Sequence, residues 1–192
     1  MTDQTLLAFD TSGPFCASAL LRDGQITTRV EDMARGQGER LMVLLEDLLR
    51  EQNTTWADLD VIGVGVGPGN FTGIRISVSA ARGLALGLGI KAVGVSLFDT
   101  TQQLANWAQT KVPAPRDQFY MYDPDKMAAP ILAQDGTGPF ANAADHSVAD
   151  HVAAIARIAA QRAGADTPRP APMYVKPPDA APPREQPPVI LP

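Results

Sequence analysis

Two segments of the sequence carry residue types that could bind a phosphate group. The first is the glycine turn Gly67–Gly73, which joins a β-branched run, Val61–Val66, to a helical stretch that starts near Ile74. Glycine lets a ligand approach the backbone closely, and the first amides of a helix are unpaired and carry partial positive charge. The turn is therefore a candidate phosphate cradle. Its candidate contacts are Gly67, Gly69, Thr72 and Gly73.

A tight strand-to-helix connection without a ligand is the alternative for this turn. The segment has neither the Gly-Lys-Ser/Thr of the Walker loop nor the glycine spacing of the Rossmann fingerprint. Pro68 also removes one of the backbone amides that a phosphate would need. The spacing by itself leaves both interpretations open.

The second segment is Asp10-Thr11-Ser12, at the end of the apolar run Thr5–Phe9. A carboxylate at a strand end could hold a hydrated magnesium ion while the two hydroxyls reach a phosphate. The alternative is an Asx-type turn, in which Asp10 accepts hydrogen bonds from nearby amides. Combined with the glycine turn, the first interpretation would make an independent ATP-binding protein or ATPase, although one carboxylate beside a proline-containing loop is poor equipment for phosphoryl transfer.

Other catalytic chemistry finds little support in the residues. His146 and His151 are five positions apart, which is not the i, i+4 spacing of paired zinc ligands on a helix. Cys16 is the single cysteine and lies among small apolar residues, as is typical of a buried structural thiol. No Gly-x-Ser-x-Gly elbow occurs. We therefore expect no catalytic residue, no metal and no cofactor.

The elements around these segments alternate between strands and helices. A three-strand meander is expected over residues 5–30, with the Asp23-Gly24 hairpin turn inside it. Glu39–Arg50 predicts an amphipathic helix with leucines on one face, and Ile74–Leu88 predicts a closely packed helix rich in alanine, serine and glycine. Either helical face could be protein core or an interface with another subunit.

Length and charge narrow the class of protein. The chain has 192 residues, which suits one compact domain or two small lobes, and its formal net charge is -5. An acidic chain lacks the electrostatic footprint of a free-standing nucleic-acid binder. The N-terminus has no signal-peptide pattern and no stretch is long and apolar enough to span a bilayer, so we expect a cytoplasmic protein.

Several segments of the sequence together resemble a known family. Leu7–Ser12 is similar to the opening strand and loop of the TsaB (YeaZ) family, and Gly67–Arg75 reads GPGNFTGIR where the family signature is usually written GPGSFTGIR. Glu39-Arg40-Leu41, Gly83-Leu84-Ala85 and Val93–Ser96 continue the resemblance. It is dense over residues 5–105 and weaker afterwards, where Arg116–Tyr120 and Tyr174–Pro177 are similar to later family segments.

The resemblance implies a non-catalytic partner of TsaD, the homologous subunit that forms N6-threonylcarbamoyladenosine beside the anticodon of tRNA. It implies a heterodimer with TsaD, a larger complex with the ATPase TsaE, contact with tRNA only through that complex, and a homodimer as one state of the isolated chain. TsaD carries a His-x-x-x-His metal pair where this chain has Ser96–Thr101, without histidine. Asp10, Thr11, Ser12 and the glycine turn are then vestigial nucleotide-type loops. The residues expected at the partner interface are Arg40, Leu41, Leu44, Leu45, Leu48, Arg75, Ser79 and Arg82.

The fold implied by the resemblance is an α/β fold of the actin/Hsp70 type (ASKHA, RNase H-like) with a reduced second lobe. We expect the actin-like lobe over residues 1–108 and a shortened second lobe over residues 109–166. Prolines dominate residues 167–192, which predicts an extended tail.

Overall fold

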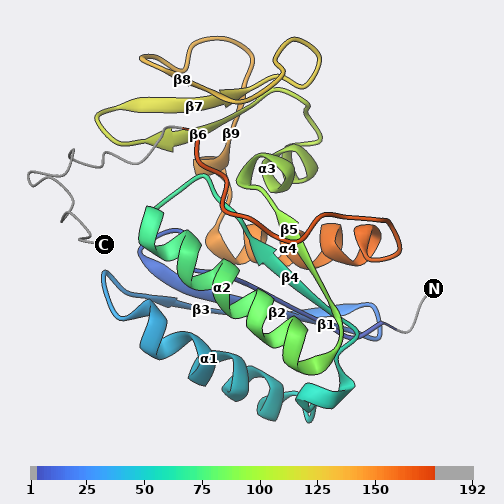
Figure 1. Ribbon diagram of the computed structural model, residues 1–192. Coiled ribbons are helices and arrows are strands. Elements are labelled where there is room, and N and C mark those ends of the chain that lie inside the picture. Colours follow the sequence, from blue (N-terminus) through green and yellow to red (C-terminus); the bar gives the residue numbers. More distant parts are fainter. Residues whose placement is uncertain (1–3, 176–192) are drawn as a thin grey trace, which may run out of the picture.

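The apolar runs of the first hundred residues form a five-stranded mixed sheet (Figure 1). In the computed structural model, which describes residues 4–175, β1 (Leu6–Asp10), β2 (Phe15–Arg22) and β3 (Gln25–Asp32) make the antiparallel meander. β4 (Val61–Gly65) and β5 (Lys91–Val95) extend the sheet in parallel from β1, in the order β3-β2-β1-β4-β5. The sequence predicts this meander and strands at Val61–Val66 and Ile90–Val95, and the structure confirms all of them.

Helices cover both faces of this sheet, which explains why β1 is apolar without alternation. α1 (Gln37–Glu51) and α2 (Phe71–Leu88) lie on one face, and α4 (Val148–Arg162) lies on the other (Figure 1). Leu7 and Phe9 pack in the core under α1 and α2, whereas Leu6 and Ala8 pack in the core under α4. A strand buried on both faces needs apolar side chains at every position.

Two helix boundaries differ from the predicted ones because of their caps. α2 begins at Phe71, three residues before the predicted start, since the Asn70 side chain accepts a hydrogen bond from the Gly73 amide (2.9 Å) and caps the helix. The sequence predicts a helix over Ser96–Ala108, but α3 (Leu97–Ala105) ends three residues earlier, because Asn106 adopts the left-handed conformation, with φ of 50°. Part of the glycine turn is therefore the first turn of a helix.

The second lobe is the smaller one and is built on a four-stranded sheet. Its strands are β6 (Thr110–Ala114), β7 (Gln118–Tyr122), β8 (Ile131–Ala133) and β9 (Ala141–Asn142), in the order β8-β7-β6-β9. The sequence predicts no strand at Val112–Arg116, because this segment contains two prolines. Pro113 is tolerated because β9 pairs only with Thr110 and Lys111, so no neighbour needs its missing amide on that side. Two short 3-10 turns, η1 (Trp56–Asp58) and η2 (Ala143–Asp145), complete the elements.

The chain returns to the first lobe after the second sheet. α4 lies within the range expected for the second lobe, residues 109–166, yet it packs across β1, β2 and β4 of the first sheet. Residues 163–175 then run back between the lobes without helix or strand, beside β5 and α2 (Figure 1). The remainder of the predicted proline-rich tail, residues 176–192, lies outside the described residues.

Candidate functional site

The two phosphate-type segments meet, and they pack against each other. The Thr11 hydroxyl donates a hydrogen bond to the Gly73 carbonyl (2.7 Å), and the Asn70 amide donates to the Ser12 carbonyl (2.6 Å). A Cβ at Gly73 would overlap the Thr11 carbonyl, and a Cβ at Gly69 would lie 2.5 Å from the Ser12 carbonyl oxygen. The glycines are therefore needed for the close contact between two loops, in addition to any contact with a ligand.

Asp10 forms the Asx-type turn that was the alternative interpretation. Its carboxylate accepts hydrogen bonds from the Ser12 amide (2.8 Å) and from the Ser12 hydroxyl (2.9 Å). Burial raises the pKa of Asp10, and the hydrogen bonds from Ser12 oppose that rise. The Asp10 carboxylate therefore has its hydrogen-bond partners within its own loop.

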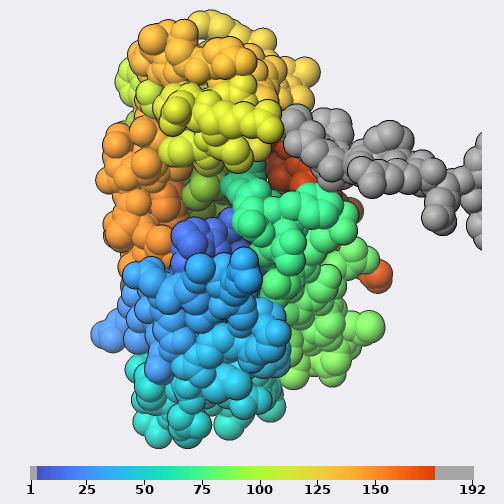
Figure 2. Space-filling model, turned by 90° about the vertical axis from the view of Figure 1, so that its left-hand side faces the viewer, coloured from blue at the N-terminus to red at the C-terminus, as the bar shows by residue number. Residues whose placement is uncertain are grey.

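A cleft of about 410 Å³ separates the lobes beside these loops. Figure 2 shows the hollow between the blue residues of the first lobe and the yellow residues of the second. Apolar side chains such as Phe15, Leu97, Val112 and Val152 form much of its lining, together with Asp10. Such a lining offers few partners for a triphosphate and its hydration shell.

Both histidines border the cleft, and His151 is held by hydrogen bonds within the protein. The Nε2–H of His151 donates to the Ala143 carbonyl (2.9 Å), and Nδ1 accepts from the Thr100 hydroxyl (2.8 Å) in the neutral tautomer that this carbonyl requires. Burial lowers the pKa of His151, against the effect of the bond to Ala143. Within residues 4–175, no group of three histidine, cysteine or acidic side chains is placed to hold a metal ion.

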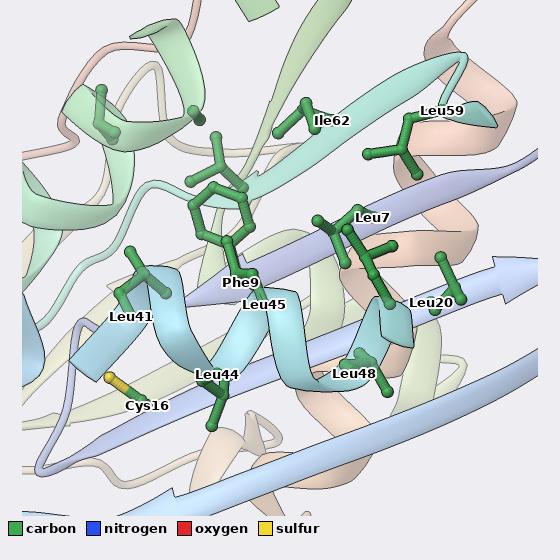
Figure 3. Packing of buried hydrophobic residues seen from close by; sticks show 14 of the residues in the cluster. Leu7, Phe9, Cys16, Leu20, Leu41, Leu44, Leu45, Leu48, Leu59 and Ile62 are labelled. Atoms are coloured by element: carbon green, nitrogen blue, oxygen red, sulfur yellow. The ribbon is translucent and has the colours of Figure 1, made fainter. Parts of the chain in front are cut away.

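The leucine face of α1 points into the protein core. Leu41, Leu44, Leu45 and Leu48 are at most 1% exposed and pack around Phe9 and Leu7 (Figure 3). The prediction that these four side chains contact a partner is therefore wrong. The reason is that the sheet face under α1 is itself apolar, so all four leucines pack against it.

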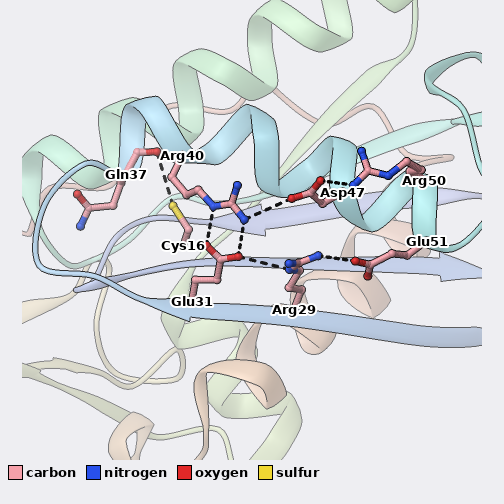
Figure 4. A network of polar contacts seen from close by, with 8 residues as sticks. All are labelled: Cys16, Arg29, Glu31, Gln37, Arg40, Asp47, Arg50 and Glu51. Carbon is pink, nitrogen blue, oxygen red and sulfur yellow. Dashed lines mark hydrogen bonds and ion pairs between the residues drawn. The ribbon is translucent and has the colours of Figure 1, made fainter.

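Arg40, also expected at the interface, is paired within the first lobe (Figure 4). Its guanidinium donates to both carboxylate oxygens of Glu31 (2.6 and 2.7 Å) and to Asp47 (3.3 Å), which clamps α1 onto β3. The hydrogen bonds from Arg40 lower the pKa of Glu31. Arg40 is 30% exposed at its side chain, so one edge of the clamp still faces solvent.

Cys16 lies beside this network. Its thiol donates a weak hydrogen bond to the Gln37 carbonyl at 3.6 Å, and burial together with the charge of Glu31 raises the pKa of Cys16 to about 11. A thiol of that pKa is protonated at neutral pH, which fits the expected structural role.

The outer face of α2 is exposed where the interface was expected. Arg75, Ser79 and Arg82 all face solvent. Sequence reasoning missed Leu86, which continues the same stripe at spacings of four, three and four residues and is 83% exposed. On neighbouring α1, Met42 and Val43 are 37% and 45% exposed. The helical spacing of Leu86 from Arg82 was the signal that could have found it.

A further contact on α2 comes from residues 163–175, which we call the returning segment. Tyr174 stacks on Phe71 with ring centroids 4.8 Å apart, and its hydroxyl accepts a hydrogen bond from Arg75 Nε (2.9 Å). The Met173 amide donates to the Val66 carbonyl (2.8 Å). This segment therefore fixes the N-terminal end of α2, and the sequence carried no signal for its destination.

Comparison with protein families matches residues 30–159, more than half of the chain, to TsaD, the tRNA N6-adenosine threonylcarbamoyltransferase. Among solved structures, YeaZ from Pseudomonas aeruginosa is similar at 24% identity with a TM-score of 0.72, over 89% of this chain and 99% of that one. The chain belongs to the TsaD family, in its TsaB (YeaZ) branch.

A second solved TsaB-like structure has the same extent of similarity. It is an uncharacterized protein from Pseudomonas aeruginosa with similarity to peptidase YeaZ, at 25% identity and a TM-score of 0.73, over 90% of this chain and 100% of that chain. No curated protein matches this TsaB-type chain. Its sheet order and two-lobed arrangement are those of the actin-like ASKHA fold. No helix within residues 4–175 has the length and apolar character needed to cross a bilayer.

Proposed function

We propose that this chain is a non-catalytic subunit that binds a TsaD-type catalytic subunit and supports the formation of N6-threonylcarbamoyladenosine next to the anticodon of tRNA. The observation that carries the proposal is the exposed helical face of α1 and α2. This docking face consists of Met42, Val43, Ser79, Arg82, Gly83 and Leu86.

The docking face has the character of a helix-packing surface. Leu86 projects as a large apolar side chain into solvent, at 83% exposure, and Ser79 and Gly83 beside it are small enough to admit a close neighbour. A Cβ at Gly83 would meet no atom within 4 Å in the lone chain. Helices from a second subunit can pack into such a stripe, with Leu86 as an anchor.

The residues that follow β5 support a non-catalytic role. Ser96 and Asp99 form a capping box at the start of α3: the Ser96 hydroxyl accepts from the Asp99 amide (3.0 Å), and Asp99 accepts from the Ser96 amide (2.8 Å). These residues stand where the resemblance puts the metal-binding histidines of TsaD. In this chain the position stabilises a helix.

The remaining partners follow from the same proposal. TsaE joins the pair in a larger complex, and tRNA is held by that complex, since an acidic chain of net charge -5 is a poor partner for phosphates. The isolated chain pairs with a second copy through the docking face when TsaD is absent. The complex acts in the cytoplasm, where tRNA is modified.

Titration of the chain with its cognate TsaD subunit tests the proposal. Co-elution in size exclusion is expected, and Leu86→Asp should raise the dissociation constant at least about tenfold, because it buries a charge against an apolar surface. Ile131→Asp, at a 48% exposed position on β8, is the matched control and should bind like the original chain. Absence of co-elution, or equal effects of the two variants, would refute the proposal.

Reconstitution of the tRNA modification gives an independent readout of function. TsaD and TsaE should form the modified adenosine with this chain present, and much less without it. Modification that proceeds equally well without the chain would remove the functional half of the proposal while leaving the pairing itself in place.

A further inference from the structure

A groove of about 520 Å³ lies between the C-terminal half of α2 and the returning segment. Arg82, Ala85 and Leu86 border it from α2, and Thr167, Arg169 and Pro170 border it from the other side. Its floor is the connection into β5, with Ile90 and Ala92. The groove thus adjoins the docking face, and residues 167–170 of the returning chain form one of its sides.

The charge of this groove is opposite to the charge of the chain. Arg82, Lys91 and Arg169 line it, and none of the described residues that line it is acidic. Within residues 4–175, neither Arg82 nor Arg169 forms an ion pair. The Lys91 ammonium donates only to neutral carbonyls, those of Ala163 and Ala165 (3.1 Å each). In a chain of net charge -5, this is a concentration of uncompensated positive charge.

The apolar part of the lining narrows the ligand class. Ala85, Leu86, Ile90, Ala92 and Pro170 lie between and below the charged groups. A bare phosphate would leave these surfaces in contact with water, whereas a peptide that presents a carboxylate next to an aliphatic side chain would satisfy both kinds of surface. The arginine guanidinium is also suited to bidentate contact with a carboxylate.

We infer that this groove receives an acidic segment of the docked TsaD-type subunit. An aspartate or glutamate of that segment pairs with Arg82 and Arg169, and a neighbouring aliphatic side chain rests on Leu86 and Ile90. The inference rests on the proposed function, because Leu86 and Arg82 belong to both the groove and the docking face. It adds what the partner must present at this end of α2, and it gives the returning segment a role in recognition.

Arg169 provides the sharpest test, since it lies outside α1 and α2 and is exposed. Affinity for the cognate TsaD subunit is measured by calorimetry at two salt concentrations for the original chain and for Arg169→Glu, Arg169→Lys and Arg157→Glu. Arg157 is the matched control, an exposed arginine on α4, across the sheet from the docking face. Thermal melting of each variant checks that the fold is intact.

Arg169→Glu should raise the dissociation constant about tenfold and weaken the salt dependence of binding, because one attractive charge pair becomes repulsive. Arg157→Glu should bind nearly as the original chain does. Arg169→Lys should bind with an affinity between those of the original chain and Arg169→Glu, because lysine keeps the positive charge but loses the bidentate contact. If the original chain binds and Arg169→Glu binds equally well, or no worse than Arg157→Glu, the groove inference is overturned and the proposed function stands. If the original chain does not bind at all, the proposed function fails and the inference falls with it.

Discussion

At the scale of single residues, two leucines on neighbouring helices have opposite roles. Leu45 on α1 is fully buried under the sheet, whereas Leu86 on α2 is 83% exposed. Both belong to leucine-containing helical stretches, and composition does not distinguish them. The difference arises because α1 turns its apolar stripe to the sheet, while Leu86 lies on the polar side of α2.

Truncation of these two leucines should therefore affect different properties. Leu45→Ala should lower the free energy of unfolding by about 2–5 kcal/mol, because it leaves a cavity in the core. Leu86→Ala should change it by no more than about 0.5 kcal/mol, as is usual for an exposed site. Urea unfolding of both variants measures the contrast, and equal losses would contradict the assignment of the two faces.

His151 should make the stability depend on pH in the mildly acidic range. Because its pKa is lowered in the folded protein, the unfolded chain, with a histidine pKa of about 6.5, binds the proton more readily. The contribution of His151 to the free energy of unfolding is therefore fully present above about pH 6.5. It is lost as the pH falls from there toward the pKa of His151 in the folded protein.

The variant His151→Gln isolates this effect, since its amide can still donate to Ala143 but does not titrate. Urea unfolding at pH 7.5 and pH 5 should show a smaller loss for the variant than for the original chain. Parallel pH profiles would show that His151 is not the group responsible.

At the scale of elements, the stability of α2 and its proposed packing against a partner helix favour different residues at position 83. Its glycines weaken an isolated helix, and its exposed glycine at position 83 has open space around it. Helix stability alone would favour alanine there. Close approach of a partner helix would favour glycine.

Gly83→Ala separates these two demands. The variant should be more stable than the original chain by up to about 1 kcal/mol, as expected from helix propensity. It should also bind the cognate TsaD subunit more weakly, because the added methyl group keeps the partner backbone at a distance. Thermal unfolding and calorimetry measure the two effects, and a stabilised variant with undiminished affinity would argue against close helix packing.

The returning segment depends on a few contacts with α2. Tyr174→Ala removes the stacking on Phe71 and the hydrogen bond from Arg75, which should cost about 1 kcal/mol. The Met173 amide, bonded to Val66, should then exchange with solvent hydrogen faster. Hydrogen exchange followed by mass spectrometry tests this, with the exposed Ile131→Ala as the control that should leave the exchange unchanged.

At the scale of the whole molecule, the cleft between the lobes argues against an independent ATPase. In an independent ATPase, the loops at Asp10 and Gly69 would have to leave room for phosphates. Instead the loops bond to each other, and the cleft beside them is lined largely by apolar side chains. We therefore expect calorimetry with millimolar Mg-ATP to give no binding heat for the isolated chain. Saturable binding would revive the nucleotide hypothesis.

Local features of the sequence determined much of the first lobe. Continuous apolar runs marked β1 and β4, the Asp23-Gly24 pair marked the hairpin, and the leucine period marked α1, because each of these signals acts within a few residues. The resemblance to the family implied an interface that includes Arg75, Ser79 and Arg82, and these three side chains are exposed. β6 could not be inferred from local sequence, because Pro113 disrupts a strand only where a neighbouring strand needs its backbone amide, and that depends on the pairing in the sheet.

Only the tertiary structure decided which surfaces remain free. It buried the leucines of α1, returned α4 to the first sheet, placed Arg82 and Arg169 on the lining of one groove, and brought Tyr174 beside Phe71. These outcomes join residues far apart in the chain and depend on how whole faces are covered. A residue's own type and its near neighbours do not determine which faces the rest of the chain covers. The sequence by itself therefore indicated the family and the helices, whereas only the structure showed which helical faces are exposed.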